Sequence, residues 1–283
     1  MGFRRTGATI SKKPYPIEKQ SGHWGKCTPF HSFGVSYQEA KQIQNELCEK
    51  VELVDTIDHA GEGILVGGAD VAFISAEYHS SDQTEVFNEH SSSPEFCTRF
   101  QKLSGKNSPV TALAIVVTME NGKDSAVEVS KASAPVVYPY IPGLLSFREG
   151  PAVLAAIGGL QTLPHVMLYD GAGIAHPRGL GLASHMAVLT GIPSIGCAKS
   201  LLCGECSEPG TEKGDWTELR LGNHVVGACV RTRRGVKPIY ISPGSGFTVQ
   251  GAVEFVLSLS GKYRIPEPTR IAHTLVTAEK QRM

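Results

Sequence analysis

A short apolar run, a helical segment and a second short apolar run follow one another in the second half of this 283-residue chain. The two runs are Val166–Tyr169 and Ser194–Ala198, and residues 182–189 between them carry apolar side chains at helical spacing. Two strands that are joined through a helix lie parallel in one sheet, because the helix returns the chain to the edge where it started. The pattern therefore predicts an α/β domain.

An Asn-Gly pair in the first half adds an antiparallel hairpin to this parallel pair. Asn121-Gly122 lies between the β-rich runs 112–119 and 126–129, and Asn-Gly tolerates the two positive φ angles of a type I′ turn. The length fits one large domain or two small ones, and neither an internal repeat nor a linker after residue 30 is visible. We expect a single α/β domain with a mixed sheet.

Helix signals place further elements along the chain. Ser36 and Glu39 form a capping box before a helix that is expected to end near Glu52. Further helices are expected over 144–160, with Pro151 in the first turn, from Thr248 and from about Thr269, and further strands over 64–74, 225–230 and 238–241. We expect a flexible N-terminal arm over 1–32 and a folded domain over 33–283, with a surface insertion at 77–108 that is rich in Ser, Asn, His and charge.

The amino-acid composition narrows the class of protein but does not identify a binding partner. The 27 basic and 27 acidic side chains cancel, so net charge does not indicate a polyanionic partner. The basic cluster Arg231, Arg233, Arg234 and Lys237 fits either a track for phosphates or a solvated edge. No apolar run is long enough to span a membrane. The seven scattered cysteines, without a secretory leader, favour a reducing compartment, hence a cytoplasmic location, or a nuclear or nucleolar one in a eukaryote.

Three acidic residues occupy positions where structural acids are uncommon. Asp70 interrupts an apolar strand, Asp170 ends another, and Glu149 lies at an expected helix entry. Buried carboxylates need partners, and Mg²⁺ accepts several oxygen ligands. The same acids also fit a bulge, a loop cap and a first-turn partner of the helix dipole. Both interpretations are open from the residues alone.

Two loops carry residue types that suit nucleic acid. Gly171 and Gly173 let backbone approach a ligand, and His176 and Arg178 follow as a titratable group and a bidentate donor. The third glycine of a dinucleotide fingerprint is absent, so no nucleotide cofactor is expected. In Pro139-Tyr140-Ile141-Pro142, an aromatic ring sits on a rigid loop that could enter a base stack, although a packed loop anchor is the simpler alternative. Lys199 could neutralise a phosphate or be merely solvated.

Taken in order, these segments resemble the endonuclease V family. The resemblance rests on the motifs Val66–Phe73, Pro139–Glu149, Asp170–Arg178, Gly181–His185, Gly196–Ser200 and Arg264–Arg270. It implies an RNase H-like fold and a monomeric hydrolase that uses Mg²⁺, with Mn²⁺ as a substitute. The implied reaction is cleavage of the second phosphodiester 3′ to a deaminated purine in DNA or RNA that contains inosine, for repair or for turnover of inosine RNA.

The resemblance also implies roles for residues of this chain. Asp70, Glu149 and Asp170 match the metal-binding catalytic carboxylates. Lys199 and His176, expected to be catalytic, and Arg178, expected to bind nucleic acid, match residues near the metal and the scissile phosphate. The nucleic-acid-binding set also includes Gly171 and the strand-separating wedge formed by Pro139, Tyr140, Ile141 and Pro142, with Tyr140 at the lesion.

One position departs from the family pattern. Ser245 stands where the family usually has a histidine, which we assign to the catalytic site. A serine cannot accept a proton near pH 7 as an imidazole does, so weakened cleavage is expected. The alternative is a catalytically impaired protein that binds inosine-containing nucleic acid without cutting it.

Overall fold

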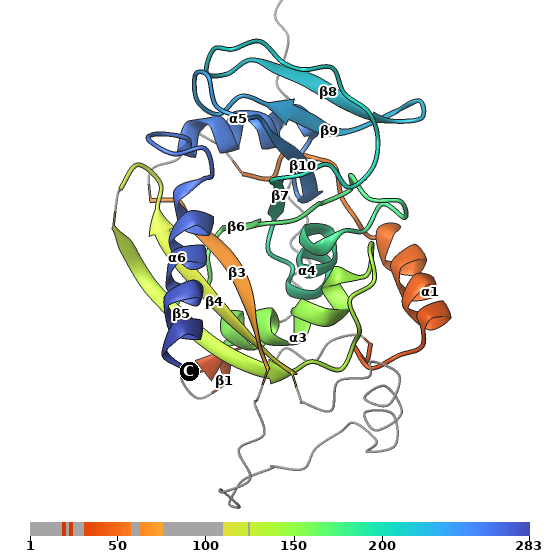
Figure 1. The fold of residues 1–283 in the computed structure, drawn as a ribbon, viewed down its shortest axis with the longest axis vertical. Helices are drawn as coiled ribbons and strands as arrows, with labels where there is room; N and C mark the ends of the chain where they lie inside the picture. Colours follow the sequence, from red (N-terminus) through yellow and green to blue (C-terminus); the bar gives the residue numbers. More distant parts are fainter. Residues whose placement is uncertain (1–18, 21–22, 25–30, 58–62, 76–109, 124) are drawn as a thin grey trace, which may run out of the picture.

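A computed structural model describes residues 19–20, 23–24, 31–57, 63–75, 110–123 and 125–283. Its centre is an eight-stranded sheet of order β5-β4-β3-β6-β7-β10-β9-β8 (Figure 1). The strands are β3 Leu65–Ser75, β4 Val110–Glu120, β5 Ala126–Pro135, β6 Val166–Tyr169, β7 Ser194–Ala198, β8 Trp216–Leu221, β9 His224–Val230 and β10 Ile239–Ser245; β1 Lys19–Gln20 and β2 His23–Trp24 pair separately. Most of the expected arm over 1–32 and all of the expected insertion at 77–108 lie outside the described residues.

The sheet is mixed, as the sequence predicts. β6 is parallel to both β3 and β7, whereas the other neighbouring pairs are antiparallel. The β4–β5 pair is the expected hairpin, with Gly122 at φ 80° in its turn. The single α/β domain with a mixed sheet is therefore confirmed.

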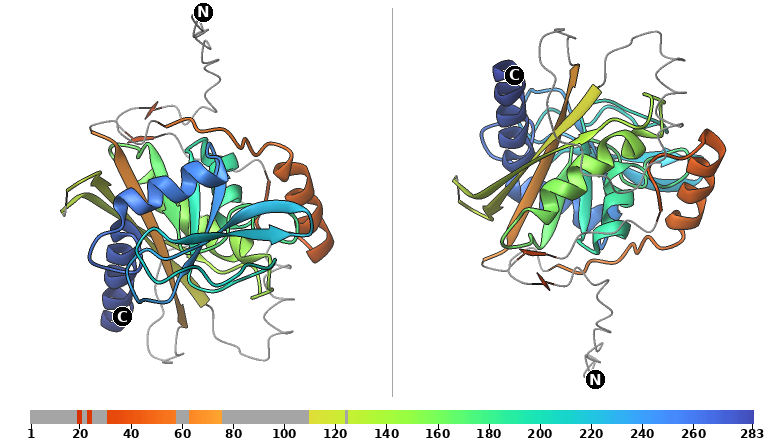
Figure 2. Two further views of the ribbon diagram at one scale, coloured as in Figure 1. Left: turned by 90° about the horizontal axis from the view of Figure 1, so that it is seen from above. Right: turned by 90° about the horizontal axis from the view of Figure 1, so that it is seen from below.

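Helices cover both faces of this sheet (Figures 1 and 2). The helices are α1 Tyr37–Cys48, α3 Leu145–Gly158, α4 Leu182–Thr190, α5 Val249–Leu259 and α6 Glu267–Arg282. Along β4, Ala112, Ala114 and Val116 join the core under α3 and α4, while the alternate residues Leu113, Ile115 and Val117 pack with α6. Because both faces are covered, the central strands are apolar on both sides, which explains their continuous apolar runs. Among the described helices, none is long and apolar enough to cross a membrane.

Several element boundaries differ from the expected ones. The Ser36–Glu39 capping box is present, but α1 ends at Cys48 instead of Glu52. Helix α6 begins at Glu267 instead of Thr269. Pro268 is tolerated in its first turn, because the N–H that a proline lacks would have no helical partner there. Pro151 lies inside α3 and not in its first turn.

Two strand assignments were incomplete. Strand β8 was not predicted, because it lies at the sheet edge and its exposed polar and charged residues hide the apolar alternation. Strand β10 was expected to end at Ile241 but continues through Pro243 to Ser245. A register shift between Pro243 and Ser245 accommodates the proline, which has no N–H to donate to a neighbouring strand.

Candidate active site

Two of the three candidate carboxylates lie level with each other on adjacent parallel strands. β3 and β6 are paired up to Ala69 opposite Tyr169, and Asp70 and Asp170 are the next residue of each chain segment. Asp70 does not lie at a bulge, because β3 pairs with β4 without a register shift over its whole length. The carboxyl end of a parallel strand is where sites of α/β proteins commonly form, so the topology brings these acids together.

The Asp70 carboxylate has a histidine partner that the sequence analysis did not identify. His273 on α6 donates from Nδ1 to Oδ2 of Asp70 at 2.7 Å. Burial raises the pKa of Asp70, the His273 contact lowers it, and the Asp170 carboxylate raises it again. The Asp170 carboxylate is therefore close enough to disfavour the charge on Asp70.

The third carboxylate, Glu149, has the most perturbed pKa of the three. Burial is the main cause, and the charges of Asp70 and Asp170 add to it, so that the pKa of Glu149 rises to about 8. The Arg148 guanidinium opposes this rise. Glu149 lies in the second turn of α3, so the expected place at the helix entry was wrong. All three acids thus interact electrostatically.

Lys199 completes this end of the site. It follows β7, the strand next to β6, and its Nζ lies 2.5 Å from Oδ2 of Asp170. Arg264 holds the backbone of this segment, since its Nη2 donates to the Lys199 carbonyl at 3.2 Å. The lysine is partly exposed, so its charge is available beyond Asp170.

The donor set suits a divalent cation, although its present contacts are with protein groups. Carboxylate oxygens, which all three acids supply, are the ligands that Mg²⁺ and Mn²⁺ prefer. In the described part of the chain, however, no three His, Cys, Asp or Glu side chains are close enough to share a metal ion as they stand. Asp70 is bonded to His273 and Asp170 to Lys199. Sharing an ion would require these carboxylates to change partners.

Ser245 does not occupy a position near these carboxylates, which corrects the expectation for this residue. It pairs with Ser194 at the start of β7, whereas Tyr240 pairs with Ala198 at the end that precedes Lys199. Along β7, Ser194 and Ala198 are four residues apart, so Ser245 lies about 13 Å from the end of the strand that precedes Lys199. The Ser245 hydroxyl accepts a hydrogen bond from the Glu52 N–H at 3.0 Å. The histidine beside the acids is His273, so Ser245 gives no structural reason for impaired catalysis.

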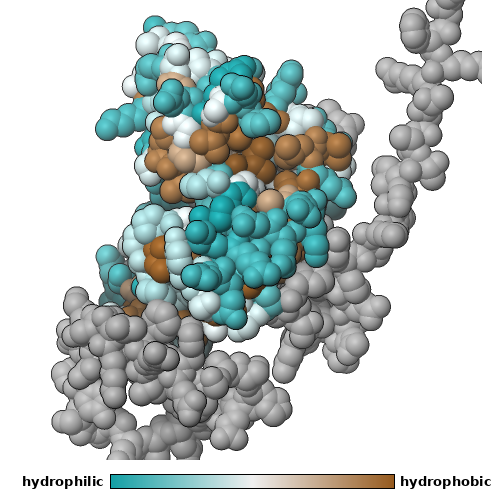
Figure 3. All heavy atoms as spheres, turned by 90° about the vertical axis from the view of Figure 1, so that its right-hand side faces the viewer, coloured by the Kyte–Doolittle hydropathy of each residue, from teal (hydrophilic) through white to brown (hydrophobic). Residues whose placement is uncertain are grey.

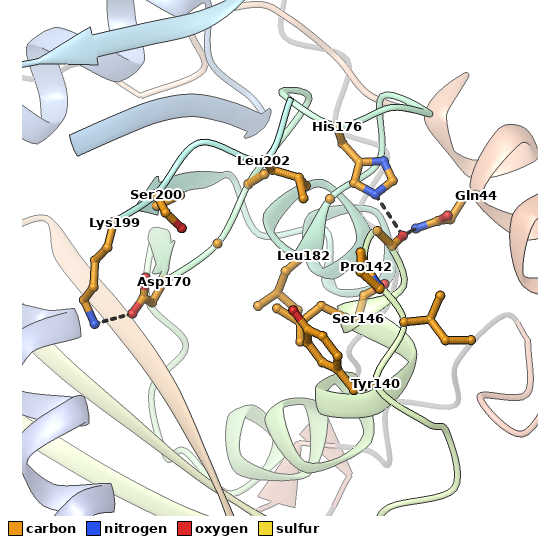
Figure 4. Close-up of a pocket in the computed structure, with 17 residues that line it drawn as sticks. Gln44, Tyr140, Pro142, Ser146, Asp170, His176, Leu182, Lys199, Ser200 and Leu202 are labelled. Atoms are coloured by element: carbon orange, nitrogen blue, oxygen red, sulfur yellow. Dashed lines mark hydrogen bonds and ion pairs between the residues drawn. The ribbon is translucent and has the colours of Figure 1, made fainter. Parts of the chain in front are cut away.

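A pocket of about 340 Å³ adjoins Asp170 and Lys199 (Figure 4). Its lining comes from α1, the 140–146 segment, the loop after β6, α4 and the segment after β7, and includes Gln44, Tyr140, Ile141, Pro142, Ser146, Gly171, His176, Leu182 and Leu202. Asp70, Glu149, Pro139 and Arg178 are not among the lining residues. The pocket therefore joins one end of the carboxylate cluster to the expected wedge.

Apolar side chains are exposed around this pocket. Tyr140 is 70% exposed, and Leu201 and Leu202 follow Lys199 with large exposed fractions. Tyr140 is therefore not a packed loop anchor. Figure 3 shows one face of the molecule, on which apolar surface forms a band between hydrophilic regions. Exposed aromatic and aliphatic groups next to a pocket suit contact with bases.

His176 and Arg178 are engaged by the protein backbone. His176 Nε2 and Arg178 Nη2 both donate to the Gly143 carbonyl, each at 2.8 Å. Burial lowers the pKa of His176 to about 4; the hydrogen bond to the Gly143 carbonyl opposes this lowering, and the Arg178 charge adds a smaller lowering of its own. The imidazole is thus neutral at pH 7, and a role of either residue at the scissile phosphate stays a prediction.

The remaining sequence features have structural explanations. Arg231 is buried, where it donates to the carbonyls of Gly210, Pro209 and Val236 and pairs with Glu208. It therefore does not belong to a phosphate track. Cys203 and Cys206 are free thiols.

Known proteins resemble this chain over most of its length. Residues 98–274 match the family model for Endonuclease V. The chain is 39% identical over 247 residues to an endonuclease V of Methanothrix thermoacetophila, covering 87% of this chain and 92% of the relative. The structure of the Streptomyces avermitilis endonuclease V has 34% identity and a TM-score of 0.70, over 88% of this chain and 94% of that one.

A further solved structure resembles the fold. It is the Ciona intestinalis endonuclease V in complex with a 23mer DNA that contains an inosine followed by a ribo-adenosine. It has 24% identity and a TM-score of 0.67, and the match covers 88% of this chain and 99% of that one. The family model matches more than half of this chain, and the Methanothrix relative is 39% identical over 87% of it. This chain therefore belongs to the endonuclease V family of nucleases.

Proposed function

We propose that this protein is a divalent-cation-dependent endonuclease that hydrolyses the second phosphodiester 3′ to inosine or deoxyinosine in DNA or RNA. The observation that carries the proposal is the level placement of Asp70 and Asp170 on adjacent strands, with Glu149 coupled to both and a pocket alongside. Three antiparallel strands, β3 to β5, are followed by β6 and β7, which run parallel to β3. This order, with Asp70 on β3 and Asp170 directly after β6, also supports the RNase H-like assignment. Family membership and the inosine DNA bound by the Ciona protein support the substrate.

Asp70, Asp170 and Glu149 would hold the cation, for which we propose Mg²⁺ with Mn²⁺ as a substitute. When bound, such an ion lowers the pKa of a water and stabilises the leaving oxygen. Glu149, whose pKa of about 8 keeps it protonated at neutral pH without a cation, would lose that proton to act as a ligand. Lys199 would then be free to neutralise phosphate charge.

His273 is proposed as the proton-carrying group of the site. Its Nδ1 is fixed by Asp70 at 2.7 Å, and the side chain is more than half exposed. An imidazole that is oriented by a carboxylate on one nitrogen can exchange a proton through the other. This role is the one that the sequence analysis had given to the position of Ser245.

The pocket beside Asp170 is proposed to receive the deaminated base. An enzyme that must reach a single nucleotide swings it out of the stack and reads its edge by hydrogen bonds. Pro139 and Pro142 restrict the loop that presents the exposed Tyr140, so the ring can replace the displaced base in the stack. Gly171 at the pocket wall allows close approach of the nucleotide.

We further propose that the enzyme acts as a monomer in the cytoplasm, or in the nucleus or nucleolus of a eukaryote. The five cysteines in the described residues are all free thiols, which agrees with a reducing compartment.

The test is cleavage of end-labelled oligonucleotides that contain one inosine, in Mg²⁺ or Mn²⁺, by the wild type and by Asp70→Ala. We expect a product cut at the second phosphodiester 3′ to inosine, and no product without the cation or with the variant. A matched pair of DNA and RNA substrates identifies the natural strand. Wild-type protein in excess that leaves both strands intact would contradict the proposal.

A further inference from the structure

The carbonyl oxygen of Gly143 is an unusually crowded hydrogen-bond acceptor. It receives bonds from His176 Nε2 and Arg178 Nη2 at 2.8 Å and from Gln44 Nε2 at 3.0 Å. The other ring nitrogen of His176, Nδ1, accepts from the Arg178 backbone N–H at 3.1 Å. The neutral imidazole therefore uses its one donor and its one acceptor within the protein.

Gln44, one of these three donors, also bonds to a second one, Arg178. It is a buried residue of α1, and its Oε1 accepts from Arg178 Nε at 2.5 Å. Its Nε2 donates to the Leu180 carbonyl at 3.1 Å as well as to Gly143. The amide oxygen thus faces a guanidinium and the amide nitrogen faces two carbonyls, so one orientation of the side chain satisfies every partner.

The Gly143 peptide is the downstream end of the 139–142 loop. The Leu144 N–H donates to the Ile141 carbonyl at 2.9 Å and Gly143 has φ 78°, which together are the signature of a type II turn. A Cβ at Gly143 would come within 3.1 Å of Arg178 Nη2 and 3.2 Å of His176 Nε2. Glycine is therefore required both for the turn and for the approach of the donors.

The upstream end of the same loop is held in a similar way. Arg148 Nη1 donates to the Tyr138 carbonyl at 2.9 Å, and the Arg148 guanidinium stacks on the Phe73 ring at 4.3 Å. Tyr140, between the two anchored carbonyls, is exposed. The loop thus presents its ring from a backbone that is fixed at both ends.

We propose that Gln44 is a positioning residue that acts through the Gly143 carbonyl to hold the 139–142 loop in the form that separates two strands. The inference rests on the proposed function of that loop. A loop that is already ordered loses less conformational entropy when it enters a duplex. Gln44 therefore matters where strands must be separated and much less where the substrate is already a single strand.

The experiment compares kcat/KM on duplex and on single-stranded inosine DNA of the same sequence. Gln44→Glu places a carboxylate oxygen against the Gly143 and Leu180 carbonyls, and Gln44→Met removes the donors without adding charge. Gln42→Met is the matched control, because Gln42 is an exposed residue of the same helix that bonds only to Glu46 in the described structure. Thermal melting shows which variants are folded. If Gln44→Glu does not fold, the comparison is made with Gln44→Met alone.

We expect both Gln44 variants to lose at least about tenfold more kcat/KM on the duplex than on the single strand, because a small misplacement of a positioning group is costly, whereas the loss of a pocket contact affects both substrates alike. Gln42→Met should match the wild type on both. Equal losses on the two substrates, or no loss on the duplex, would overturn the inference. Wild-type protein that cleaves neither substrate would instead refute the proposed function, so the two failures are distinguishable.

Discussion

Glu149 shows how strongly the fold sets the chemistry of a single carboxyl group. Its pKa of about 8 is caused first by burial and then by the charges of Asp70 and Asp170. Between the unfolded pKa near 4.5 and the folded value near 8, the folded protein binds a proton that the unfolded chain does not. The contribution of Glu149 to stability is therefore full below about pH 4.5 and is lost as the pH rises towards 8.

Replacing Glu149 by Gln should remove this pH dependence. In the absence of divalent cations, we expect the melting temperature of Glu149→Gln relative to the wild type to rise by at least about 3 °C between pH 5 and pH 8. Melting curves of the two proteins in matched buffers measure it. A difference that is constant across this range would show that Glu149 does not hold a proton at neutral pH.

His273 and Ser245 give opposite predictions for the same reaction. We expect His273→Ala to lower the single-turnover rate constant on an inosine substrate by about a hundredfold, since it removes the proton-carrying group beside Asp70. Ser245→Ala should stay within about twofold of the wild type, because the Ser245 hydroxyl contacts the Glu52 backbone. Single-turnover cleavage measures both. A large loss in Ser245→Ala with a normal His273→Ala would restore the original assignment of Ser245.

The docking of α6 on β3 determines where His273 lies. A Cβ on Gly68 would come within 2.2 Å of the Pro268 backbone and 2.4 Å of Thr269 N, so the start of α6 lies directly against a glycine of β3. From this contact the helix runs past Asp70. His273 lies five residues after Pro268 in α6, and its side chain there reaches the Asp70 carboxylate.

Gly68→Ala should therefore both destabilise the fold and weaken catalysis. We expect a loss of about 1–3 kcal/mol in the free energy of unfolding and reduced cleavage, because α6 must move away from the sheet. Gly158→Ala is the control, since a Cβ there meets nothing within 4 Å and alanine favours helix. Urea unfolding with a cleavage assay tests the pair. Equal stability of Gly68→Ala and Gly158→Ala would refute this account of α6.

Elements with a strong local signal were predictable from the sequence. The Asn121-Gly122 turn, the Ser36 capping box and strands β6 and β7 are set by neighbouring residues, and the structure contains all of them. Strand β8 was missed because an edge strand needs no continuous apolar pattern. Its pairing with β9 depends on partners that are not encoded within its own six residues.

A site residue was predictable only where its type is unusual for its place in the sequence. Asp70 and Asp170 stand out as acids in or next to apolar strands, but the contact between His273 and Asp70 joins residues that are 203 positions apart. Gln44 resembles any other helical glutamine until Arg178 and Gly143 are seen around it. Ser245 was misassigned because sequence order does not show which end of an antiparallel strand faces the acids.

At the scale of the whole molecule, cation binding should be linked to stability. We expect Mn²⁺ at about 100 times its dissociation constant to stabilise the wild type by about 2.7 kcal/mol, and its melting temperature to fall again on addition of EDTA. Asp70→Asn should show less of this gain because it lacks one charged ligand. Differential scanning calorimetry measures both, and an equal gain in the two proteins would indicate a cation site elsewhere.

The most direct test of the central claim is the position of the cation itself. Anomalous diffraction from crystals grown with Mn²⁺ locates the ion without assumptions about activity. We predict a peak with carboxylate oxygens of Asp70 and Asp170 at about 2.0–2.3 Å, Glu149 turned towards it, and Asp70 and Asp170 released from at least one of their present partners. A peak away from these three carboxylates, or none at saturating Mn²⁺, would contradict the account.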